Sequence, residues 1–549
     1  MTPPAIYSRI MADEQESASA ERVEPESRVA SDEKAVAEPE IEPGKSSDEE
    51  PRIESAESAA TPGESAEAGC PVGMGYYPAQ SCGRKLHAAP DGVDERLVCL
   101  MHSKDPNKQS GPLFDAFWLE FERILAEAGE NEAFFERFIF PQVDIRGREF
   151  QAACRFDGAT FTQDANFDFA TFKQYANFDG ATFKQKADFY AATFTQNASF
   201  FGAAFTQRAN FQRAAFTQGA NFILATFKQK ADFYAATFTQ DANFDFATFT
   251  QVAGFWSTRF HGRADWRRCN FLDQAEFRHT QFLPTIDRTP SGVFYLAKFA
   301  RPAEAVFDDV DLSHALFHNS DASQVWFTSS VKWAKRESNR GLAVFEETVP
   351  LDQDFERELQ RDGQRDYRAV AQIYQQLKKN YDSRLDYWTA NEFHFGEMEM
   401  KRLAGPTGGP LLRLRRWLHP RLSLVALYRY ASDYGNSYGK PMLWLLGILV
   451  LFAALFPLPG VGLKRQGASQ AESYASVWNL QKSYGENLWR EGRLAGKGAI
   501  AAVDTATFQK SAEYAPAYPW GRVLAIFETL LTSTLFGLFL LAIRRQFRR

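Results

Sequence analysis

The sequence has few of the residues that perform chemistry in enzymes. It contains 8 His and 5 Cys among 549 residues, and the histidines lie in unrelated segments. No G-x-S-x-G or H-E-x-x-H motif is present, and no strand is followed by G-x-G-x-x-G. The GKSS at 44–47 lacks the earlier glycine of a phosphate-binding loop, because position 39 is Pro. We therefore predict that the protein is not an enzyme.

Aromatic residues are almost absent from positions 1–69, where 18 acidic residues stand against 6 basic ones. This stretch is rich in Glu, Ser, Ala and Pro, so it cannot bury enough apolar surface to offset the entropy lost on ordering. We predict a disordered acidic tail at 1–69. It does not start with a basic segment followed by an apolar run, so we expect no export signal there and reduced thiols throughout.

Phenylalanine, by contrast, is abundant, with 50 Phe against 19 Tyr and 11 Trp. From Ile145 to Phe282 a large apolar residue recurs at alternating intervals of five and six residues, at 26 positions without interruption. FKQKADFYAATFTQ occurs twice, starting at 183 and 227, and DANFDFATF occurs twice, starting at 164 and 241. These separations are four and seven times eleven residues, so the repeating unit has eleven residues. A fixed repeat of this kind predicts a solenoid.

The residue two places before each ring is equally regular. It is Ala at all 18 positions from Ala159 to Ala253. A large and a small residue two positions apart fit the side-chain alternation of a strand, whereas intervals averaging 5.5 residues do not fit a helix. We therefore expect Phe211 and Ala209 to be buried, and Gln212 and Arg213 to face water. The Thr, Gln, Lys, Asp and Asn residues between the rings are expected to be solvated.

The units ANFDGATF, ADFYAATF and ANFQRAAF resemble the pentapeptide-repeat family, in its variant with alternating five- and six-residue faces. The resemblance implies a mainly β fold, a right-handed quadrilateral β-helix. With four faces to a coil, residues 145–282 would make about six coils. After Phe282 the pattern breaks at LPTIDRTPSG and resumes in five-residue steps from Phe307 to Phe327. We predict a solenoid over 141–335 with an insertion near 283–293.

The five cysteines fall into two groups. Cys154 and Cys269 each precede a ring by two, in the slot that Ala fills elsewhere, so they are expected to be core residues. The other three precede the solenoid and, with one histidine, could bind zinc tetrahedrally through three thiolates and one imidazole. These four residues are Cys70, Cys82, Cys99 and His102.

Only the Cys-x2-His end of this set has a common ligand spacing, since the other separations are longer. His87 is an alternative ligand, and three unrelated thiols remain the other interpretation. We therefore predict a small Cys/His module at 70–110 with one structural zinc. The protein would fill all four coordination positions, which leaves no open position for catalysis.

Helical segments are expected on both sides of the solenoid. PLFDAFWLEFERILAEAG has apolar residues at roughly helical spacing, and we predict a helical cap at 111–140 that covers the first coil. Beyond the terminal coil, Tyr367, Val370, Ile373, Tyr374 and Leu377 share one helical stripe. Residues 340–440 are therefore expected to be a helical linker. This stretch resembles the segment that joins repeats to membrane helices in membrane-bound pentapeptide-repeat proteins.

The C-terminal part has two long apolar runs. Residues 442–463 form 22 consecutive residues without a charge, and 523–543 form a second run interrupted only by Glu528. We predict a two-helix transmembrane hairpin at 441–549, with a loop at 464–519. Basic residues precede the first run and follow the second, so both termini are expected in the cytoplasm and the loop outside. The expected location is the inner (cytoplasmic) cell membrane.

These features favour a membrane-anchored cytoplasmic scaffold for protein–protein interaction, with membrane lipid and an unknown cytoplasmic protein as partners. A channel-like two-span oligomer regulated by the solenoid is the alternative, although the SYGE at 483–486 lacks the run of a potassium filter. A topoisomerase-type DNA mimic is less favoured, because residues 156–282 hold 11 acidic and 12 basic residues. The same balance argues against nucleic-acid binding. Homo-oligomerisation remains open.

Overall fold

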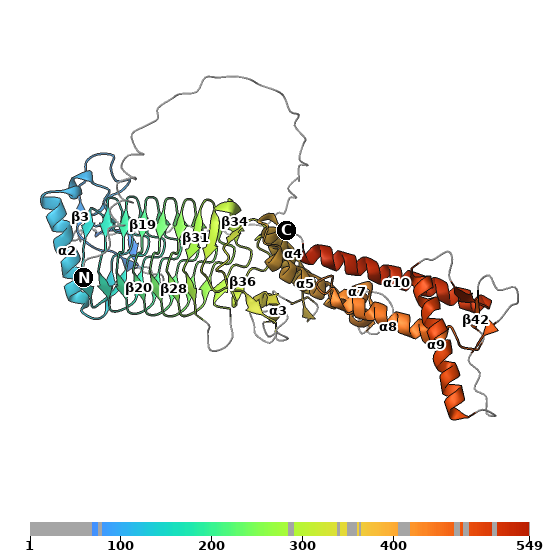
Figure 1. The fold of residues 1–549 in the computed structure, drawn as a ribbon. Helices are drawn as coiled ribbons and strands as arrows, with labels where there is room; N and C mark the ends of the chain where they lie inside the picture. The colour runs from blue at the N-terminus through green and yellow to red at the C-terminus, as the bar shows by residue number, and fades with distance from the viewer. Residues whose placement is uncertain are drawn as a thin grey trace, which may run out of the picture. The chain divides into compact units, whose positions relative to one another are not determined.

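Figure 1 shows the computed structural model of the chain. The structure describes residues 69–74, 80–283, 290–336, 341–348, 360–361, 364–404, 418–459, 461–465, 473–475, 483–507 and 513–547. The disordered tail predicted at 1–69 lies outside the described residues, except for Gly69. Most of the insertion predicted near 283–293 also lies outside them.

The centre of the chain is a β-solenoid with four parallel sheets (Figure 1). Equivalent residues of successive turns pair 22 residues apart, as Thr160 does with Thr182 and Ala165 with Ala187. The chain passes through the four sheets in order, and we number them sheets 1 to 4. Two of them contain 9 strands, so the solenoid has about nine turns. The four-sided fold that the family resemblance implied is confirmed.

Almost every strand of the solenoid is two residues long. Sheet 1 consists of β5 (Glu132–Phe134), β9 (Ala153–Arg155), β13 (Ala176–Asn177), β17 (Ala198–Ser199), β21 (Ala220–Asn221), β25 (Ala242–Asn243), β29 (Ala264–Asp265), β33 (Gly292–Val293) and β36 (Ala315–Leu316). Sheet 2 consists of β6 (Ile139–Phe140), β10 (Thr160–Phe161), β14 (Thr182–Phe183), β18 (Ala204–Phe205), β22 (Thr226–Phe227), β26 (Thr248–Phe249), β30 (Asn270–Phe271) and β34 (Lys298–Phe299). Sheet 3 consists of β7 (Val143–Asp144), β11 (Ala165–Asn166), β15 (Ala187–Asp188), β19 (Ala209–Asn210), β23 (Ala231–Asp232), β27 (Ala253–Gly254), β31 (Ala275–Arg278), β35 (Ala305–Asp308) and β37 (Trp326–Phe327). Sheet 4 consists of β8 (Glu149–Phe150), β12 (Thr171–Phe172), β16 (Thr193–Phe194), β20 (Ala215–Phe216), β24 (Thr237–Phe238), β28 (Arg259–Phe260) and β32 (Gln281–Phe282).

The rings form four ladders inside the solenoid. Phe211, for example, is fully buried and stacks between Phe189 and Phe233, with centroid distances of 4.9 and 5.0 Å and nearly parallel planes. It also meets Phe200 edge to face at 5.5 Å, so neighbouring ladders interlock. Ala209, two residues earlier, is fully buried as well. The predicted inward positions are therefore confirmed.

The polar residues between the rings are only partly solvated. Arg213 is exposed as predicted, but Gln212 is half-buried and donates to Asp232. In sheets 1 and 3 the residue before a ring is usually Asn or Asp, and its side chain often accepts the backbone N–H two residues later, as Asn177 does from Asp179 at 2.9 Å. This is an Asx turn, which fixes the corner of the coil. The expectation that the Asn and Asp residues face water was wrong at such corners, where Asn177 and Asp232 are buried.

The solenoid is longer than the six coils estimated from the sequence. Its first strand, β5, begins at Glu132, inside the range predicted to be the helical cap. The rings Phe135 and Phe140 already belong to the ladders and stack on Phe156 and Phe161. These two rings could not be assigned to the repeat from the sequence, because the intervals from Phe135 to Phe150 do not alternate and Phe138, not Ala, stands two places before Phe140.

The first coil is covered by helix α2 (Pro112–Ala128). Pro112 occupies the first helical turn and Gly129 ends the helix. The buried face of α2 places Phe121 on Phe135, with ring centroids 4.5 Å apart, and Phe117 against Phe140 at 5.4 Å. The ring ladder thus continues into the covering helix. Before α2 lie β1 (Gly73–Met74), β2 (Gln80–Ser81), β3 (Leu86–His87), β4 (Val98–Cys99) and the 3-10 helix η1 (Pro106–Gln109).

The last coil is covered by helix α4 (Tyr367–Ser383), which packs against α5 (Tyr387–Leu403). Asn380 donates to the backbone carbonyls of Ala322 and Val325, and Arg384 donates to those of Val325 and Phe327. These side chains satisfy acceptors that a further coil would otherwise bind. The smaller elements near this end are η2 (Pro302–Glu304), β38 (Ala334–Lys335), β39 (Leu342–Ala343), α3 (Phe345–Thr348), β40 (Gln360–Arg361) and β41 (Gln364–Arg365).

The C-terminal part contains α7 (Leu424–Ser432), α8 (Gly439–Leu455), α9 (Tyr484–Ala506) and α10 (Pro519–Gln546). Residues Pro519–Arg545 are long and apolar enough to cross a membrane, judged by length and composition. The first predicted span is shorter than expected, because α8 has only 17 residues. Pro457 and Pro459 follow it and cannot continue the helix hydrogen bonding. A second full span is therefore not shown.

The segment predicted as the outer loop has structure of its own. It contributes α9 and the three-stranded antiparallel sheet of β42 (Leu463–Arg465), β43 (Ser473–Tyr474) and β44 (Tyr514–Pro516). Phe452 and Phe456 pack with Ala501 and Ala502 of α9 in one cluster.

The ring ladders predict which substitutions unfold the solenoid. Phe211→Ala should lower the free energy of unfolding by about 3–5 kcal/mol, because it empties a site enclosed by stacked rings. Arg213→Ala should change it by no more than about 0.5 kcal/mol, since that side chain is exposed. Denaturant unfolding of the full chain in detergent, followed by far-UV circular dichroism, measures both. A larger loss for Arg213→Ala than for Phe211→Ala would show that the inward positions are misassigned.

Candidate metal centre

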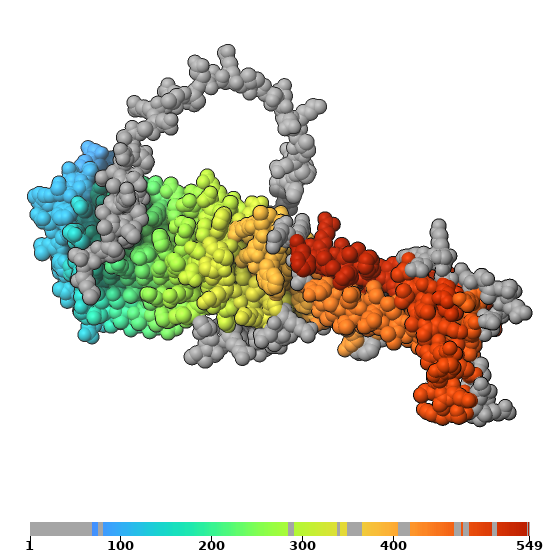
Figure 2. All heavy atoms as spheres, viewed as in Figure 1, coloured from blue at the N-terminus to red at the C-terminus, as the bar shows by residue number. Residues whose placement is uncertain are grey.

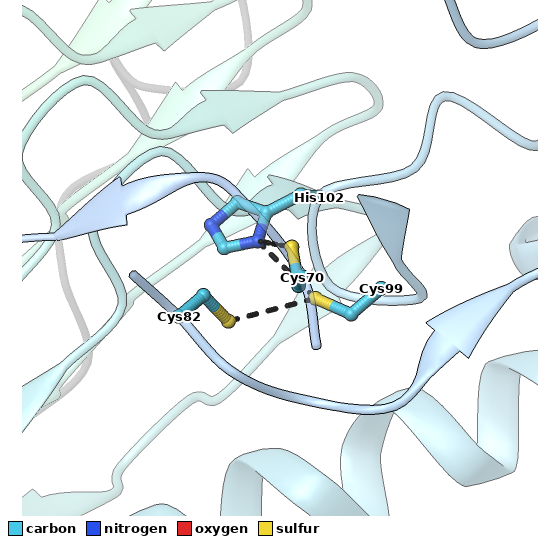
Figure 3. A group of neighbouring side chains, drawn as sticks. All are labelled: Cys70, Cys82, Cys99 and His102. Atoms are coloured by element: carbon cyan, nitrogen blue, oxygen red, sulfur yellow. Dashed lines mark hydrogen bonds between the residues drawn. The ribbon is translucent and has the colours of Figure 1, made fainter. Parts of the chain in front are cut away.

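Three cysteines and one histidine meet between the N-terminal strands and the first coil (Figure 3). Their ligand atoms, three Sγ and one nitrogen, all lie within 4.8 Å of one another. Cys70, Cys99 and His102 are buried, and Cys82 is half-buried. The structure therefore brings together all four residues that the sequence suggested, and the group could hold a metal ion.

Two backbone units position the ligands. Cys70 and Cys82 flank the β1–β2 pair, where the Cys82 N–H donates to the Val72 carbonyl and the Gly83 N–H to the Cys70 carbonyl. The turn at Gly83 has φ +64°, which favours glycine. Gly69 is also required, because a Cβ there would lie 2.5 Å from the Gly83 carbonyl oxygen.

The second unit is the end of β4. Cys99 is the last residue of that strand, and the N–H groups of His102 and Ser103 both donate to its carbonyl. The resulting turn points the Cys99 Sγ and the His102 Nδ1 at one another, 3.2 Å apart. The common Cys-x2-His spacing thus corresponds to a single tight turn.

The ligand atoms converge on one point from both units. The Cys70 Sγ lies 3.5 Å from the His102 Nδ1, and the Cys82 Sγ lies 3.8 Å from the Cys99 Sγ. The other ring nitrogen of His102, Nε2, lies 3.1 Å from the Glu136 carbonyl oxygen and donates to it. That bond leaves Nδ1 as the lone-pair nitrogen, which is the arrangement a metal-binding histidine needs.

Electrostatics favour a thiolate at Cys82. Hydrogen bonds from the Cys99 thiol and from Arg84 hold the pKa of Cys82 well below its usual range. The Arg84 Nη1 lies 3.1 Å from the Cys82 Sγ, and its Nε donates to Glu120 of α2. The shared Cys82–Cys99 hydrogen bond raises the pKa of Cys99, because its proton bridges the pair. Thiolates are the form of cysteine that binds metals.

The remaining sequence candidates lie elsewhere. The His87 Nε2 lies 2.8 Å from Asp105 Oδ2, so the alternative ligand contacts a carboxylate outside the group. Cys154 and Cys269 are buried in the solenoid, as predicted, and burial raises the pKa of the Cys154 thiol to about 12. Arg84 and the Glu136 carbonyl, which contact the Cys82 sulfur and the His102 ring, could not be identified from the sequence. Only the glycines beside Cys70 and Cys82 could have signalled tight turns at the ligands.

The group of three cysteines and His102 contacts the first turn of the solenoid through ring packing and backbone hydrogen bonds. The His102 ring meets Phe138 edge to face at 5.1 Å, and the Ile139 N–H of the first turn donates to the Met101 carbonyl. Arg137 donates to the Gly73 carbonyl from the same turn. The four residues therefore connect β1–β4, α2 and the first coil. With every ligand supplied by protein, this arrangement fits a structural role and offers no open position for a substrate.

Comparison with known proteins supports the repeat itself. Residues 178–223 match the family model described as pentapeptide repeats (9 copies). No curated protein matches the chain, and no solved structure matches it. The matched residues lie wholly within the ring ladders, so the central part of the chain is a pentapeptide-repeat solenoid.

Proposed function

We propose that this chain is a non-enzymatic, membrane-anchored scaffold whose solenoid presents a rigid surface to another cytoplasmic protein. The observation that carries the proposal is a row of side chains along the corner between sheets 3 and 4, one from each of five successive turns. We call this row the corner ridge. It consists of Phe169, Tyr190, Arg213, Tyr234 and Trp256.

The corner ridge is held in place by contacts within it. Phe169 meets Tyr190 edge to face at 5.3 Å, and Tyr234 meets Trp256 at 5.9 Å. Arg213 lies over the Tyr190 ring and its Nη1 donates to the Tyr190 hydroxyl at 3.0 Å. Because the backbone beneath is fixed by the ladders, little entropy would be lost when a partner docks.

The composition of the corner ridge is that of a binding surface. Phe169 is 58% exposed and Trp256 is 46% exposed, although such rings are usually buried. Tyr, Trp and Arg are the residues that dominate the energy of protein interfaces. A partner with an apolar strip and a carboxylate facing Arg213 fits this row best. The near-equal numbers of acidic and basic residues in the solenoid favour neither nucleic acid nor DNA mimicry.

The ridge is tested by crosslinking in native membranes, followed by mass spectrometry of attached proteins. The double variant Tyr234→Ala and Trp256→Ala should lose the main crosslinked partner, because it removes the exposed ring of Trp256 and the half-buried ring of Tyr234 that contacts it. Phe246→Ala is the matched control, since Phe246 is 45% exposed at another corner, between sheets 1 and 2. If only the control variant loses the crosslinked partner, the binding surface lies away from the corner ridge. If neither variant loses the partner, the corner ridge is not part of the interface.

We propose zinc as the ion held by Cys70, Cys82, Cys99 and His102. Zinc–sulfur bonds of about 2.3 Å in a tetrahedron place two sulfurs about 3.8 Å apart, and a nitrogen ligand about 3.6 Å from a sulfur. The separation of 3.8 Å between the Cys82 and Cys99 sulfurs agrees with this. So does the separation of 3.5 Å between the Cys70 Sγ and the His102 Nδ1. Bound zinc would join the N-terminal strands and close the first end of the solenoid.

The zinc proposal makes a quantitative prediction. Purified protein should contain about one zinc per chain, and Cys82→Ser should lose most of it because three ligands bind far more weakly. Cys154→Ser should keep its zinc, since Cys154 is buried in the solenoid away from the group. Metal analysis by mass spectrometry of refolded and natively purified samples measures the content. Equal zinc in the two variants would exclude these ligands.

The membrane arrangement is also a proposal. We infer that α10 spans the inner membrane and that α8 runs beside it as the second arm of a hairpin, with the solenoid in the cytoplasm. Only 22% of the most apolar 18-residue stretch of α10 is buried against protein, which leaves the rest of that stretch to contact lipid. Lys440 lies in the first turn of α8, and Arg544 and Arg545 lie in the last turn of α10, so positive charge gathers at the end nearest the solenoid. The Arg545 Nη1 donates to the Tyr434 carbonyl at that end.

Topology is tested by labelling intact cells. A tag inserted within 476–482 should be accessible from outside, whereas a tag at the N-terminus should become accessible only after the membrane is permeabilised. The charge distribution predicts this orientation. Accessibility of the N-terminal tag alone in intact cells would reverse the proposed topology.

A further inference from the structure

Helix α9 carries an exposed face without any charged residue. Its exposed apolar side chains are Tyr484 (72%), Leu488 (57%), Trp489 (65%), Ile500 (43%) and Val503 (47%). At 100° per residue, the positions between these side chains on the same face are glycines and alanines. They are Gly485, Gly492, Ala495, Gly496 and Ala499. A face of this kind is not stable in water, so something covers it.

Most of the charged residues of α9 lie on one flank, where the basic Arg490, Arg493 and Lys497 stand beside Glu486 and Asp504. Glu491 lies at the other border of the apolar face and pairs with Arg490 at 3.7 Å. Arg493 lies 4.0 Å from the centroid of the Trp489 ring, at the border between the flank and the apolar face. The helix is therefore amphipathic, with its basic groups beside its apolar face.

The opposite side of α9 packs on the two apolar helices. Gly498 meets α8 so closely that a Cβ there would lie 2.1 Å from the Ala453 carbonyl oxygen. The Thr529 hydroxyl of α10 lies 3.4 Å from the Thr505 carbonyl oxygen. These contacts fix the C-terminal half of α9, and the half that carries Tyr484 and Trp489 projects beyond α8 and α10 (Figures 1 and 2).

These contacts place α9 at one boundary of the membrane. From Arg545 to Thr529 the helix rises about 24 Å, and to Trp520 about 37 Å. With Arg545 at the cytoplasmic boundary of a hydrocarbon core about 30 Å thick, the other boundary falls between Thr529 and Trp520. Tyr518 and Trp520 are exposed there, and aromatic residues of this kind collect at membrane interfaces.

We propose that α9 lies in the membrane interface, with its uncharged face among the lipid acyl chains and its basic flank at the headgroups. The proposal rests on the proposed membrane span of α10. Helices α8 and α10, on which α9 packs, also carry exposed apolar side chains, among them Leu446, Leu451 and Phe536.

Lipid fits this face better than a second copy of the chain does. The bulky Trp489 and Leu488 project from the face beside the small residues, so two such helices could not approach closely along it. Basic residues beside an apolar stripe favour anionic headgroups.

The test uses the full chain in vesicles of phosphatidylcholine and anionic phosphatidylglycerol. The photo-crosslinking residue p-benzoylphenylalanine replaces Trp489 in one protein and Ile500 in a second, so that the result does not depend on one variant folding. It replaces Glu486 on the charged flank in a matched control, and Phe536 of α10 in another. After irradiation, mass spectrometry of the intact protein separates lipid adducts from crosslinked chain pairs.

Lipid adducts at 489 and 500, several-fold above those at 486, support the proposal. Crosslinked chain pairs at 489 and 500 would overturn the interfacial placement of α9, and so would lipid yields there no higher than at 486. If position 536 still gives lipid adducts in that case, the membrane span of α10 is unaffected. Absence of lipid adducts at 536 would overturn the membrane span itself. The two proposals therefore fail in distinguishable ways.

Discussion

The fold depends on the match between ring stacking and strand spacing. Parallel strands lie about 4.8 Å apart, and phenyl rings stack at nearly the same distance, so one ring per face in every turn forms a continuous ladder without strain. The rings of Phe161 and Phe183 are 4.5 Å apart, and those of Phe183 and Phe205 are 4.8 Å apart. The small Ala two positions earlier leaves room for the neighbouring ladder to meet each ring edge to face. This packing explains why strands of two residues suffice, since the side chains supply the cohesion that longer strands draw from hydrogen bonds.

A ladder of stacked rings leaves an uncovered coil at each end of the solenoid. The two ends are covered in different ways. At the first coil, Phe121 of α2 stacks on Phe135 and extends the ladder into a helix, while the group of three cysteines and His102 fastens the strands outside it. At the last coil, Asn380 and Arg384 of α4 donate to free backbone carbonyls. One end is thus closed mainly by apolar packing, and the other also by polar side chains that replace the missing strand. Both devices prevent the edge-to-edge association that exposed strands invite.

The periodic part of this structure could be predicted from the sequence, and the irregular part could not. The register of Phe211 and Ala209 follows from a repeat of eleven residues, because every turn repeats the same side-chain pattern. The four metal-site residues could be named from residue types alone, but their convergence depends on turns at Gly83 and at Cys99–His102 that spacing does not reveal. The first turns were missed because the large apolar residues from Phe135 to Phe150 recur every five residues, without the alternation of five and six. The length of α8 was overestimated because hydropathy ignores the effect of Pro457 on helix geometry.

A solenoid filled by rings has consequences for how such a chain acts. Its interior is filled by stacked rings, so variation without loss of stability is confined to the corners and the outward faces. The Asn and Asp residues of the Asx turns are also committed to the fold, as the buried Asn177 shows. The turn positions after each ring are the ones left free, and there Tyr190, Tyr234 and Trp256 replace the small or polar residues found in other turns. The exposed rings at this corner, Phe169 and Trp256, contribute little to folding, and this is the reason for proposing the binding surface there.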